Sequence, residues 1–314
     1  MTKQILCHIP LSKLLDLKVD FAFKQLFGSE RNQEITIAFL NAILQRTDRD
    51  VMKEVVFLSQ EVGGEYNEDK QSRLDIVVKT QAGEYINIEM QLGNKQSMFK
   101  RTMFYWARLY VGQLQRGQGY HALAPTITIN ICNYTLLTDT PHYHSTYHLY
   151  EDLTGQRVSA KNDVLEVHFI EINKFLAAWF ADEVTHVDNG LVRWLMLLSM
   201  VDARHHRVYD EIYQKLEELA MKDNHLQQAF NAWEDMSQTP ESIIAYQSRL
   251  KYIIDEEASI VDAKQAGIEE GLEQGIAQKN KEIILTGLQN NVPIDTLALL
   301  TGYSVEQIQQ LYQK

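Results

Sequence analysis

The chain has 314 residues, 45% of them apolar, which is enough to bury the core of one large domain or of two smaller ones. Its two cysteines, Cys7 and Cys132, argue against a disulfide framework, so a reducing cytoplasm is the expected compartment. The formal net charge of −12 argues at first against a nucleic-acid partner. However, residues 1–135 hold 16 Lys and Arg against 14 Asp and Glu, and residues 136–314 hold 14 against 28, so the N-terminal half is the one that phosphate can approach.

No apolar run approaches the roughly 18 residues that a membrane span requires. The first ten residues lack the apolar stretch and the small-residue cleavage site of a secretory signal. We therefore expect a globular protein without a membrane partner.

Residues 20–46 have apolar side chains at helical spacing, with Gly28 as an interruption. Asp20 can cap the first helix, which is an ordinary structural role for an acid at such a position. Lys24 follows one turn later on the same face, where it can pair with Asp20 or contact phosphate. A strand is predicted at residues 53–59, and the acidic stretch 61–70, with two adjacent glycines, predicts a mobile loop.

Residues 72–80 and 84–91 alternate between apolar and polar side chains, which predicts two half-buried strands of a hairpin. Leu74, Ile76 and Val78 would share one face of the first strand. The connecting loop ends at Gly83, which suits a position with positive φ. If Thr80 faces Glu84, the register places Asp75 opposite Glu89 and Arg73 opposite Gln91.

Two carboxylates facing each other across a strand pair repel, with side chains only ~5 Å apart, and a cation between them removes the repulsion. Mg²⁺ takes oxygen ligands, usually one or two carboxylates with waters and a phosphate. Asp75 and Glu89 are therefore candidate metal ligands, and Gln91 is a candidate for orienting the attacking water or the phosphate. The alternative is a solvated strand face on which the acids pair with Arg73 and Lys79.

Residues 95–116 have a helical stripe of aromatic and aliphatic side chains, and the opposite side is basic. Arg101 and Tyr105 are four residues apart and share a face, so they are candidates for clamping phosphate or supporting the site. Residues 126–132 alternate as a strand should.

Several blocks of the chain resemble the Rpn-like family of recombination-promoting nucleases and transposases, within the PD-(D/E)XK nuclease superfamily. The blocks are residues 20–28, 39–44, 73–75 and 88–91, Arg101 with Tyr105, and the tail from about residue 267. The resemblance implies an α/β fold, with a restriction-endonuclease-like core (a mixed sheet flanked by helices) followed by an α-helical C-terminal region. It also implies a metal-dependent DNA endonuclease linked to recombination or mobile elements, with Asp75 and Glu89 holding Mg²⁺, or alternatively Mn²⁺ or Ca²⁺. Asp20 is then the nearest candidate for a further acid.

Position 91 departs from the superfamily pattern, which has Lys where this chain has Gln91. An amide can orient water but brings no cation to the phosphorane. Two alternatives follow: a catalytically degenerate protein of the same fold that binds DNA or oligomerises, and a strand-transferring transposase, for which no DNA-end-recognition surface is evident.

The predicted domains are a nuclease-like domain at residues 10–172, a helical region at 173–265 and a C-terminal module at 266–314. A strand pair is predicted at 143–150 and 164–172, with His142, His144 and His148 on one face, for which a structural role is favoured over a transition-metal site. Glycines at 267, 271 and 275 indicate either a homodimer contact or a flexible linker. Residues 293–311 have a helix-turn-helix outline with little positive charge, which favours packing or oligomerisation over base reading.

Overall fold

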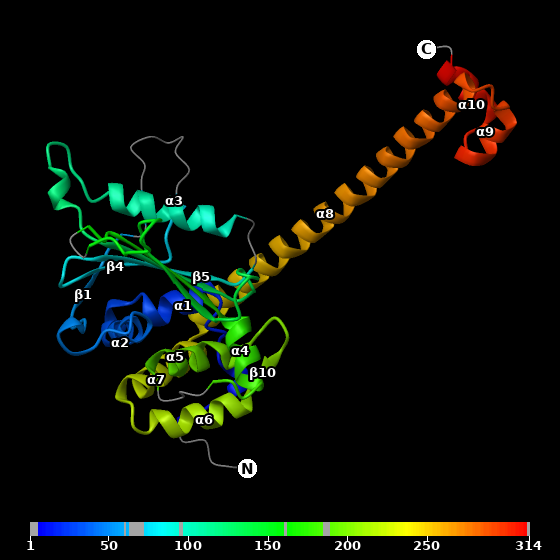
Figure 1. Cartoon of the computed structure of the whole chain (residues 1–314). Coiled ribbons are helices and arrows are strands. Elements are labelled where there is room, and N and C mark those ends of the chain that lie inside the picture. Colours follow the sequence, from blue (N-terminus) through cyan, green and yellow to red (C-terminus); the bar gives the residue numbers. More distant parts are fainter. Residues whose placement is uncertain are drawn as a thin grey trace. The chain divides into compact units, whose positions relative to one another are not determined.

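The computed structural model describes residues 6–59, 61–62, 72–93, 97–159, 162–184 and 189–312 (Figure 1). By internal contacts the chain divides into two compact units, residues 1–251 and residues 252–314. The helical stretch up to Lys251 thus belongs with the sheet, and the predicted boundary at 265/266 falls inside one continuous helix, α8 (Pro240–Gln289). The three predicted domains stay a prediction.

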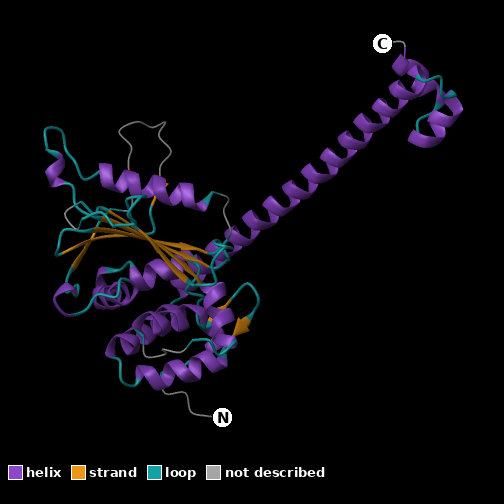
Figure 2. Cartoon of the chain, in the orientation of Figure 1, coloured by secondary structure: helices purple, strands orange, loops and turns teal. Residues whose placement is uncertain are grey.

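A six-stranded sheet forms the centre of the first unit, in the order β1-β4-β5-β6-β8-β7 (Figure 2). The strands are β1 (Val55–Phe57), β4 (Ile76–Thr80), β5 (Tyr85–Gln91), β6 (Thr126–Cys132), β7 (His144–Tyr147) and β8 (Leu165–Glu171). β5, β6 and β8 run parallel, while β1, β4 and β7 pair antiparallel, so the sheet is mixed. All of β6 is buried because helices cover both faces, as parallel strands require.

Helix α3 (Met98–Val111) covers one face of the sheet, and α1 (Asp20–Phe27) and α2 (Gln33–Ile43) cover the other (Figure 1). A further layer packs against α1 and α2 and consists of α4 (Ile172–Phe180), α5 (Gly190–Ser199), α6 (Asp210–Ala220) and α7 (Asn224–Gln238). Edge-to-face contacts of Trp194 with Phe27 and Phe39 join these layers. The predicted α/β class and the order helix, three strands, helix, strand are confirmed.

The short elements refine the predicted boundaries. Helix α5 ends at Ser199, and β9 (Val201–Asp202) then pairs with β10 (Arg207–Val208), so a short strand pair interrupts the helical region predicted at 173–265. Single 3-10 turns occupy Leu11–Lys13, Glu30–Asn32, Asp48–Asp50 and Tyr120–Ala122. The predicted mobile loop 61–70 lies outside the described residues except for Glu61 and Val62, which form β2.

The predicted hairpin register is confirmed between β4 and β5, where Ile76 pairs with Ile88 and Thr80 N–H donates to the Glu84 carbonyl at 2.9 Å. Gly83 turns the loop with φ +88°. However, the strand does not continue through residues 72–75. The prediction of one strand over residues 72–80 and the predicted pairing of Arg73 with Gln91 are therefore wrong. The chain bends before Ile76, and β3 (Ser72–Arg73) pairs with β2 (Glu61–Val62) instead of facing Gln91.

The bend also changes the face on which Leu74 lies. Leu74 packs with Val77 and Leu109, on the side of α3, and not on the face of Ile76 as alternation predicted. Because period-two alternation holds only within one unbroken strand, the bend rotates the residues before it relative to those after it. Asp75 therefore stands at the point where the two strands separate.

A buried ion pair ties the N-terminal segment to the helical layer. The Lys18 ammonium lies 2.8 Å from Asp16 Oδ1 and donates to the carbonyls of Leu198 and Val201. The other Asp16 oxygen accepts from Ala203 N–H at 2.9 Å. Both buried side chains keep hydrogen-bond partners, and this explains how the charges of Asp16 and Lys18 are tolerated in the interior.

In the second unit, α9 (Ile294–Thr301) and α10 (Val305–Tyr312) follow α8. Ile284, Leu297 and Ile308 form a small shared core, and Gly302 ends α9 with φ +73°. Because α8 is helical through all three repeated glycines, the flexible-linker alternative is wrong. Within the part of the chain that the structure describes, no helix combines the length and apolarity of a membrane span.

Candidate active site

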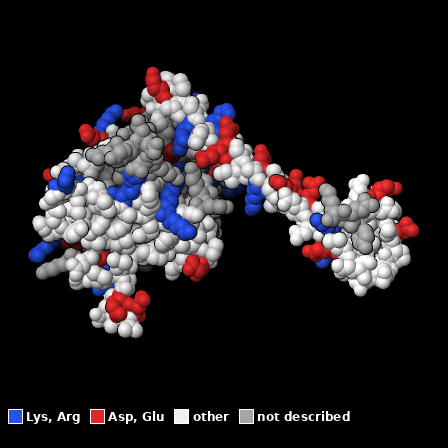
Figure 3. All heavy atoms as spheres, turned by 90° about the horizontal axis from the view of Figure 1, so that it is seen from above, with Lys and Arg blue, Asp and Glu red and all other residues white. Residues whose placement is uncertain are grey.

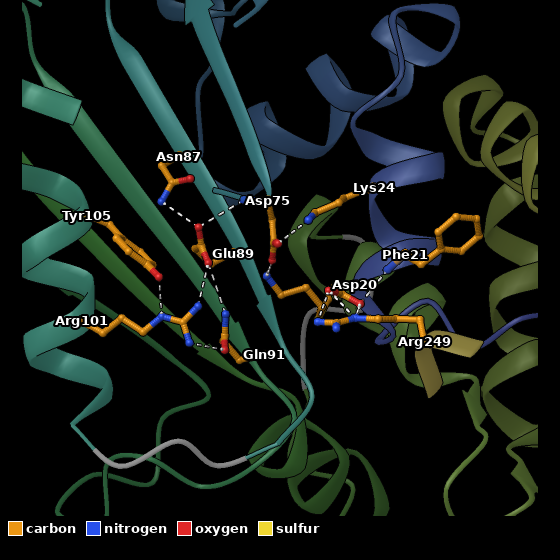
Figure 4. A network of polar contacts seen from close by, with 11 residues as sticks. Asp20, Phe21, Lys24, Asp75, Asn87, Glu89, Gln91, Arg101, Tyr105 and Arg249 are labelled. Atoms are coloured by element: carbon orange, nitrogen blue, oxygen red, sulfur yellow. Dashed lines mark hydrogen bonds and ion pairs between the residues drawn. The ribbon is translucent and has the colours of Figure 1, made fainter. Parts of the chain in front are cut away.

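Asp75 and Glu89 meet where the pairing of β4 and β5 stops (Figure 4). The Asp75 N–H donates to Glu89 Oε1 at 3.3 Å, and the Met90 N–H donates to Asp75 Oδ2 at 2.9 Å. Each carboxylate thus accepts a hydrogen bond from a backbone N–H on the other side of the strand pair. These bonds lie at the position where the hydrogen-bond ladder between β4 and β5 would otherwise continue. The side chains are buried, with Asp75 7% and Glu89 1% exposed, so the structure brings the two predicted acids together in the interior.

The electrostatics of this pair favour the arrival of a further cation. Burial, as the largest effect, raises the pKa of the Asp75 carboxyl, although Lys24 opposes it. Burial and then the neighbouring Asp75 raise the pKa of Glu89 to about 8, against an opposing effect of Arg101. Because desolvation outweighs both cations, the ionised pair is destabilised in the metal-free protein.

Lys24 contacts the first acid directly. Its ammonium lies 2.8 Å from Asp75 Oδ1, so the predicted pairing of Lys24 with Asp20 is wrong. Helix α1 delivers Lys24 because its buried residues, such as Phe23 and Phe27, fix the opposite side of the helix in the core. An ammonium on this oxygen indicates that the position accommodates a cation.

Asp20, one turn before Lys24, is held by Arg249 of α8 (Figure 4). Arg249 Nε donates to the two carboxylate oxygens at 2.8 and 2.9 Å, and Nη2 lies 2.7 Å from Oδ2. Asp20 Oδ1 also accepts from Phe21 N–H at 2.9 Å. The Asp20 charge contributes to the raised pKa of Asp75, although among the described residues Asp20 hydrogen-bonds to Arg249 and Phe21 and not to the carboxylate pair. Sequence reasoning missed Arg249, because 229 residues separate it from Asp20.

The second acid is surrounded by polar groups of β5 and α3. Gln91 Nε2 donates to Glu89 Oε2 at 3.3 Å, and Asn87 Nδ2 donates to Oε1 at 3.3 Å. Arg101 donates from Nη1 to Gln91 Oε1 at 3.4 Å and from Nε to the Tyr105 hydroxyl at 3.0 Å. The guanidinium also lies 5.1 Å from the Tyr105 ring centre. Asn87 was not among the predicted residues, although its spacing of two from Glu89 signals the same strand face.

The donor set fits a hard divalent cation. Both acids supply carboxylate oxygens, the ligands that Mg²⁺, Mn²⁺ and Ca²⁺ prefer. Over the described ranges, no group of three or more His, Cys, Asp or Glu residues could hold a metal by itself. Two carboxylates are nevertheless sufficient for Mg²⁺ when waters and a substrate phosphate complete its coordination.

Helix α3 makes the surroundings of the pair basic. It carries Lys100, Arg101 and Arg108 and no acid. Figure 3 views the molecule from the α3 side and shows Lys and Arg side chains distributed over this face of the first unit. Such a surface can attract the phosphates of a nucleic acid in spite of the negative net charge of the chain.

A family model described as PD-(D/E)XK nuclease family transposase matches residues 17–263, which include the whole sheet and every predicted site residue. Searches of curated proteins and of solved structures found no match. The family match and the mixed sheet agree with the resemblance inferred from the sequence blocks, and they support a nuclease-like or mobile-element role. Nucleases of this superfamily generally use divalent metals and act on DNA. The chain belongs to the PD-(D/E)XK nuclease family transposases.

Proposed function

We propose that the protein is a metal-dependent DNA endonuclease that hydrolyses phosphodiester bonds during recombination or the movement of mobile elements. The observation that carries the proposal is the buried pair Asp75 and Glu89, both with raised pKa values: Glu89 accepts a hydrogen bond from the Asp75 N–H, and Asp75 accepts one from the Met90 N–H. A fold without a use for a cation would gain stability by replacing either acid, since like charges in a low-dielectric interior repel.

Asp75 and Glu89 are the proposed ligands of Mg²⁺, for which Mn²⁺ or Ca²⁺ can substitute. When bound, the ion lowers the pKa of a coordinated water and neutralises charge on the scissile phosphate. Gln91 is within reach of Glu89 Oε2, so its amide can orient the water. Asp20 can become a further ligand only if its ion pair with Arg249 breaks and its carboxylate turns to the metal.

Two cations near the pair would bind the phosphate. Arg101 is oriented by Gln91 and by Tyr105, and this fixes the guanidinium beside Glu89, 3.8 Å from its Oε2. Lys24 would move from Asp75 to a phosphate oxygen when a metal takes its place. Together these two side chains can supply the positive charge that the superfamily Lys would bring at position 91.

The direct test is cleavage of supercoiled and linear DNA by purified protein with Mg²⁺, Mn²⁺, Ca²⁺ or EDTA, beside Asp75→Asn and Glu89→Gln. These variants keep the size of each side chain and remove its charge. Glu54→Gln is the matched control, because Glu54 is exposed next to β1. Metal-dependent nicking that is lost in both site variants and kept in the control is expected. Equal cleavage by all four proteins would refute the assignment of the ligands.

The alternative function is a non-catalytic DNA-binding or oligomerisation protein of the same fold. Two observations favour it: position 91 is Gln, and Asp20 is fully engaged by Arg249. This alternative predicts DNA binding that is unchanged in EDTA and in Asp75→Asn, without cleavage under any metal. A filter-binding or anisotropy titration over a salt series distinguishes the two functions.

A homodimer through the C-terminal helical region is the proposed assembly. Between Tyr252 and Leu285, α8 exposes a series of large apolar side chains: Tyr252, Ile254, Ile260, Val261, Ile268, Leu272, Ile276 and Leu285. At Gly267, Gly271 and Gly275 an added Cβ would meet no described atom within 4 Å apart from the neighbouring backbone of α8 itself, which leaves room for a second helix to approach closely. Sedimentation of the protein beside Leu272→Glu tests this assembly, and an unchanged mass would refute it.

A further inference from the structure

A second polar site lies away from the candidate active site. It is a cavity of about 730 Å³ bordered by the turn after α2, the start of β5, and strands β7 and β8. Glu84 lines it at the start of β5, whereas Gln91 ends that strand, and seven steps of ~3.3 Å separate the two residues. Val167 and Phe169 pack with Met98 under α3, so the alternating residues Glu166 and His168 point to the opposite face of the sheet.

A chain of three side chains crosses the floor of this cavity. Glu166 Oε1 lies 2.7 Å from His168 Nε2, and His168 Nδ1 lies 2.8 Å from His144 Nε2. Burial, as the largest single effect, raises the pKa of Glu166, but the hydrogen bond with His168 and the nearby positive groups together lower it, so the carboxylate accepts from His168 Nε2. In neutral His168, Nδ1 is then the acceptor and His144 Nε2 the donor. His144 is left with a bare Nδ1, for which no partner is found among the described residues.

The remaining lining also has unsatisfied acceptors. Asp163 binds Arg157 through Oδ2 at 2.6 Å, but its buried Oδ1 has no partner within the described ranges. His148 Nδ1, also buried, is likewise without one. Leaving such an atom unpaired costs about 1–3 kcal/mol. One oxygen of the Asp163 carboxylate is thus not compensated by Arg157.

The charge of the lining decides which ligand fits. Four acids (Asp50, Glu84, Asp163 and Glu166) face two arginines (Arg46 and Arg157), which leaves two negative charges in excess when the histidines are neutral. Burial, as the largest cause, lowers the pKa of His144 to about 4, so His144 adds no positive charge near neutral pH. A phosphate or carboxylate ligand would be repelled by this excess of negative charge.

We propose that this cavity binds a small organic cation of the alkylammonium class, which donates a hydrogen bond to His144 Nδ1 while the carboxylates of Asp163 and Glu166 balance its charge. Glu166 and His168 act as positioning residues, because they fix the tautomer and the ring orientation of His144. The two arginines are engaged in the ion pairs Arg46–Glu84 and Arg157–Asp163, which reduces their repulsion of the ligand's charge. The site does not depend on the proposed nuclease activity.

Calorimetric titration of the full chain with butane-1,4-diamine at fixed ionic strength tests the site, and butane-1,4-diol serves as the uncharged ligand of equal length. Asp163→Asn and Glu166→Gln remove one charge each with little change of shape. His142→Ala is the matched control, because His142 is exposed shortly before β7 and does not line the cavity. Far-ultraviolet circular dichroism of every variant checks that it is folded.

We expect saturable binding of the diamine at one site, no binding of the diol, and at least tenfold weaker binding by Asp163→Asn and by Glu166→Gln, with the control unchanged. A tenfold loss is the size expected when one nearby negative charge that balances the ligand is removed. If one site variant unfolds, the other carries the test. No saturable binding, equal binding of the diol, or equal affinity in all folded variants would overturn the proposal, since the last result describes unspecific attraction to an acidic protein.

Discussion

Replacing Glu89 by Gln should make the metal-free protein more stable while removing the function proposed for it. Glu89 has a pKa of about 8 in the folded chain against 4.5 for an ordinary glutamate. Between these two values the unfolded chain binds fewer protons than the folded one, so the free energy of unfolding falls as the pH rises from about 4.5 to about 8. Near neutral pH the cost to the fold is about 3 kcal/mol.

The amide recovers only part of this cost. An NH₂ group in place of Glu89 Oε2 faces the Nε2 donor of Gln91, and the loss of that hydrogen bond offsets about 1 kcal/mol. The expected net gain is therefore about 2 kcal/mol at pH 7, about 3 kcal/mol at pH 8 and close to zero at pH 5, which lies near the ordinary glutamate pKa of the unfolded chain. The increase with pH separates this mechanism from a general improvement in packing.

Thermal or urea unfolding in EDTA at pH 5 and pH 8 measures the effect, with Glu54→Gln as the control for an exposed glutamate, expected within about 0.5 kcal/mol of wild type. Adding Mg²⁺ should stabilise the wild-type protein and not Glu89→Gln, because only the former keeps both proposed ligands. A Glu89→Gln protein that is equally or less stable than wild type at pH 8, with a normal control, would refute the reasoning.

Three further outcomes are expected. Arg249→Met should release Asp20 and strengthen Mn²⁺ binding severalfold in calorimetry, and an unchanged affinity would contradict a ligand role for Asp20. Lys18→Met leaves its buried aspartate partner unpaired and should lower the free energy of unfolding by about 3–5 kcal/mol in urea titrations, whereas a loss below about 1 kcal/mol would show that the pair matters little. Burial and then His168 lower the pKa of His144 to about 4 from 6.5, so the unfolded chain binds more protons and stability should fall as pH drops through that window. His144→Gln should flatten this acid-side loss by about 2 kcal/mol, and an unchanged pH profile would argue against it.

The periodicity of the sequence was sufficient for the elements and for part of the site. The alternating residues of β4 and β5, with Gly83 between them, fix a register that brings Asp75 and Glu89 together, because cross-strand partners in a tight hairpin follow from counting outward from its turn. Helical spacing likewise placed Arg101 and Tyr105 on one face, and the two side chains do contact each other.

Predictions failed where a residue contacts a residue distant in sequence and not a neighbour in its own helix or strand. Pairing with Asp20 in its own helix was one of the two alternatives for Lys24, and the side chain pairs with Asp75 instead. The bend before Ile76 turned Leu74 toward α3. The hydrogen bond between His144 and His168 forms only because β7 lies beside β8. Alternation along β7 alone carries no signal for a histidine on another strand.

The sequence by itself determined the local elements, the hairpin register and the family blocks, because these depend on neighbours within a few residues along the chain. Tertiary structure alone decided that Arg249 holds Asp20 across 229 residues, and that a cavity forms on the face of the sheet opposite α3. These contacts arise when separate layers pack against one another. Which charged groups then meet is set by the fit of buried surfaces, and that fit is not encoded at any fixed spacing.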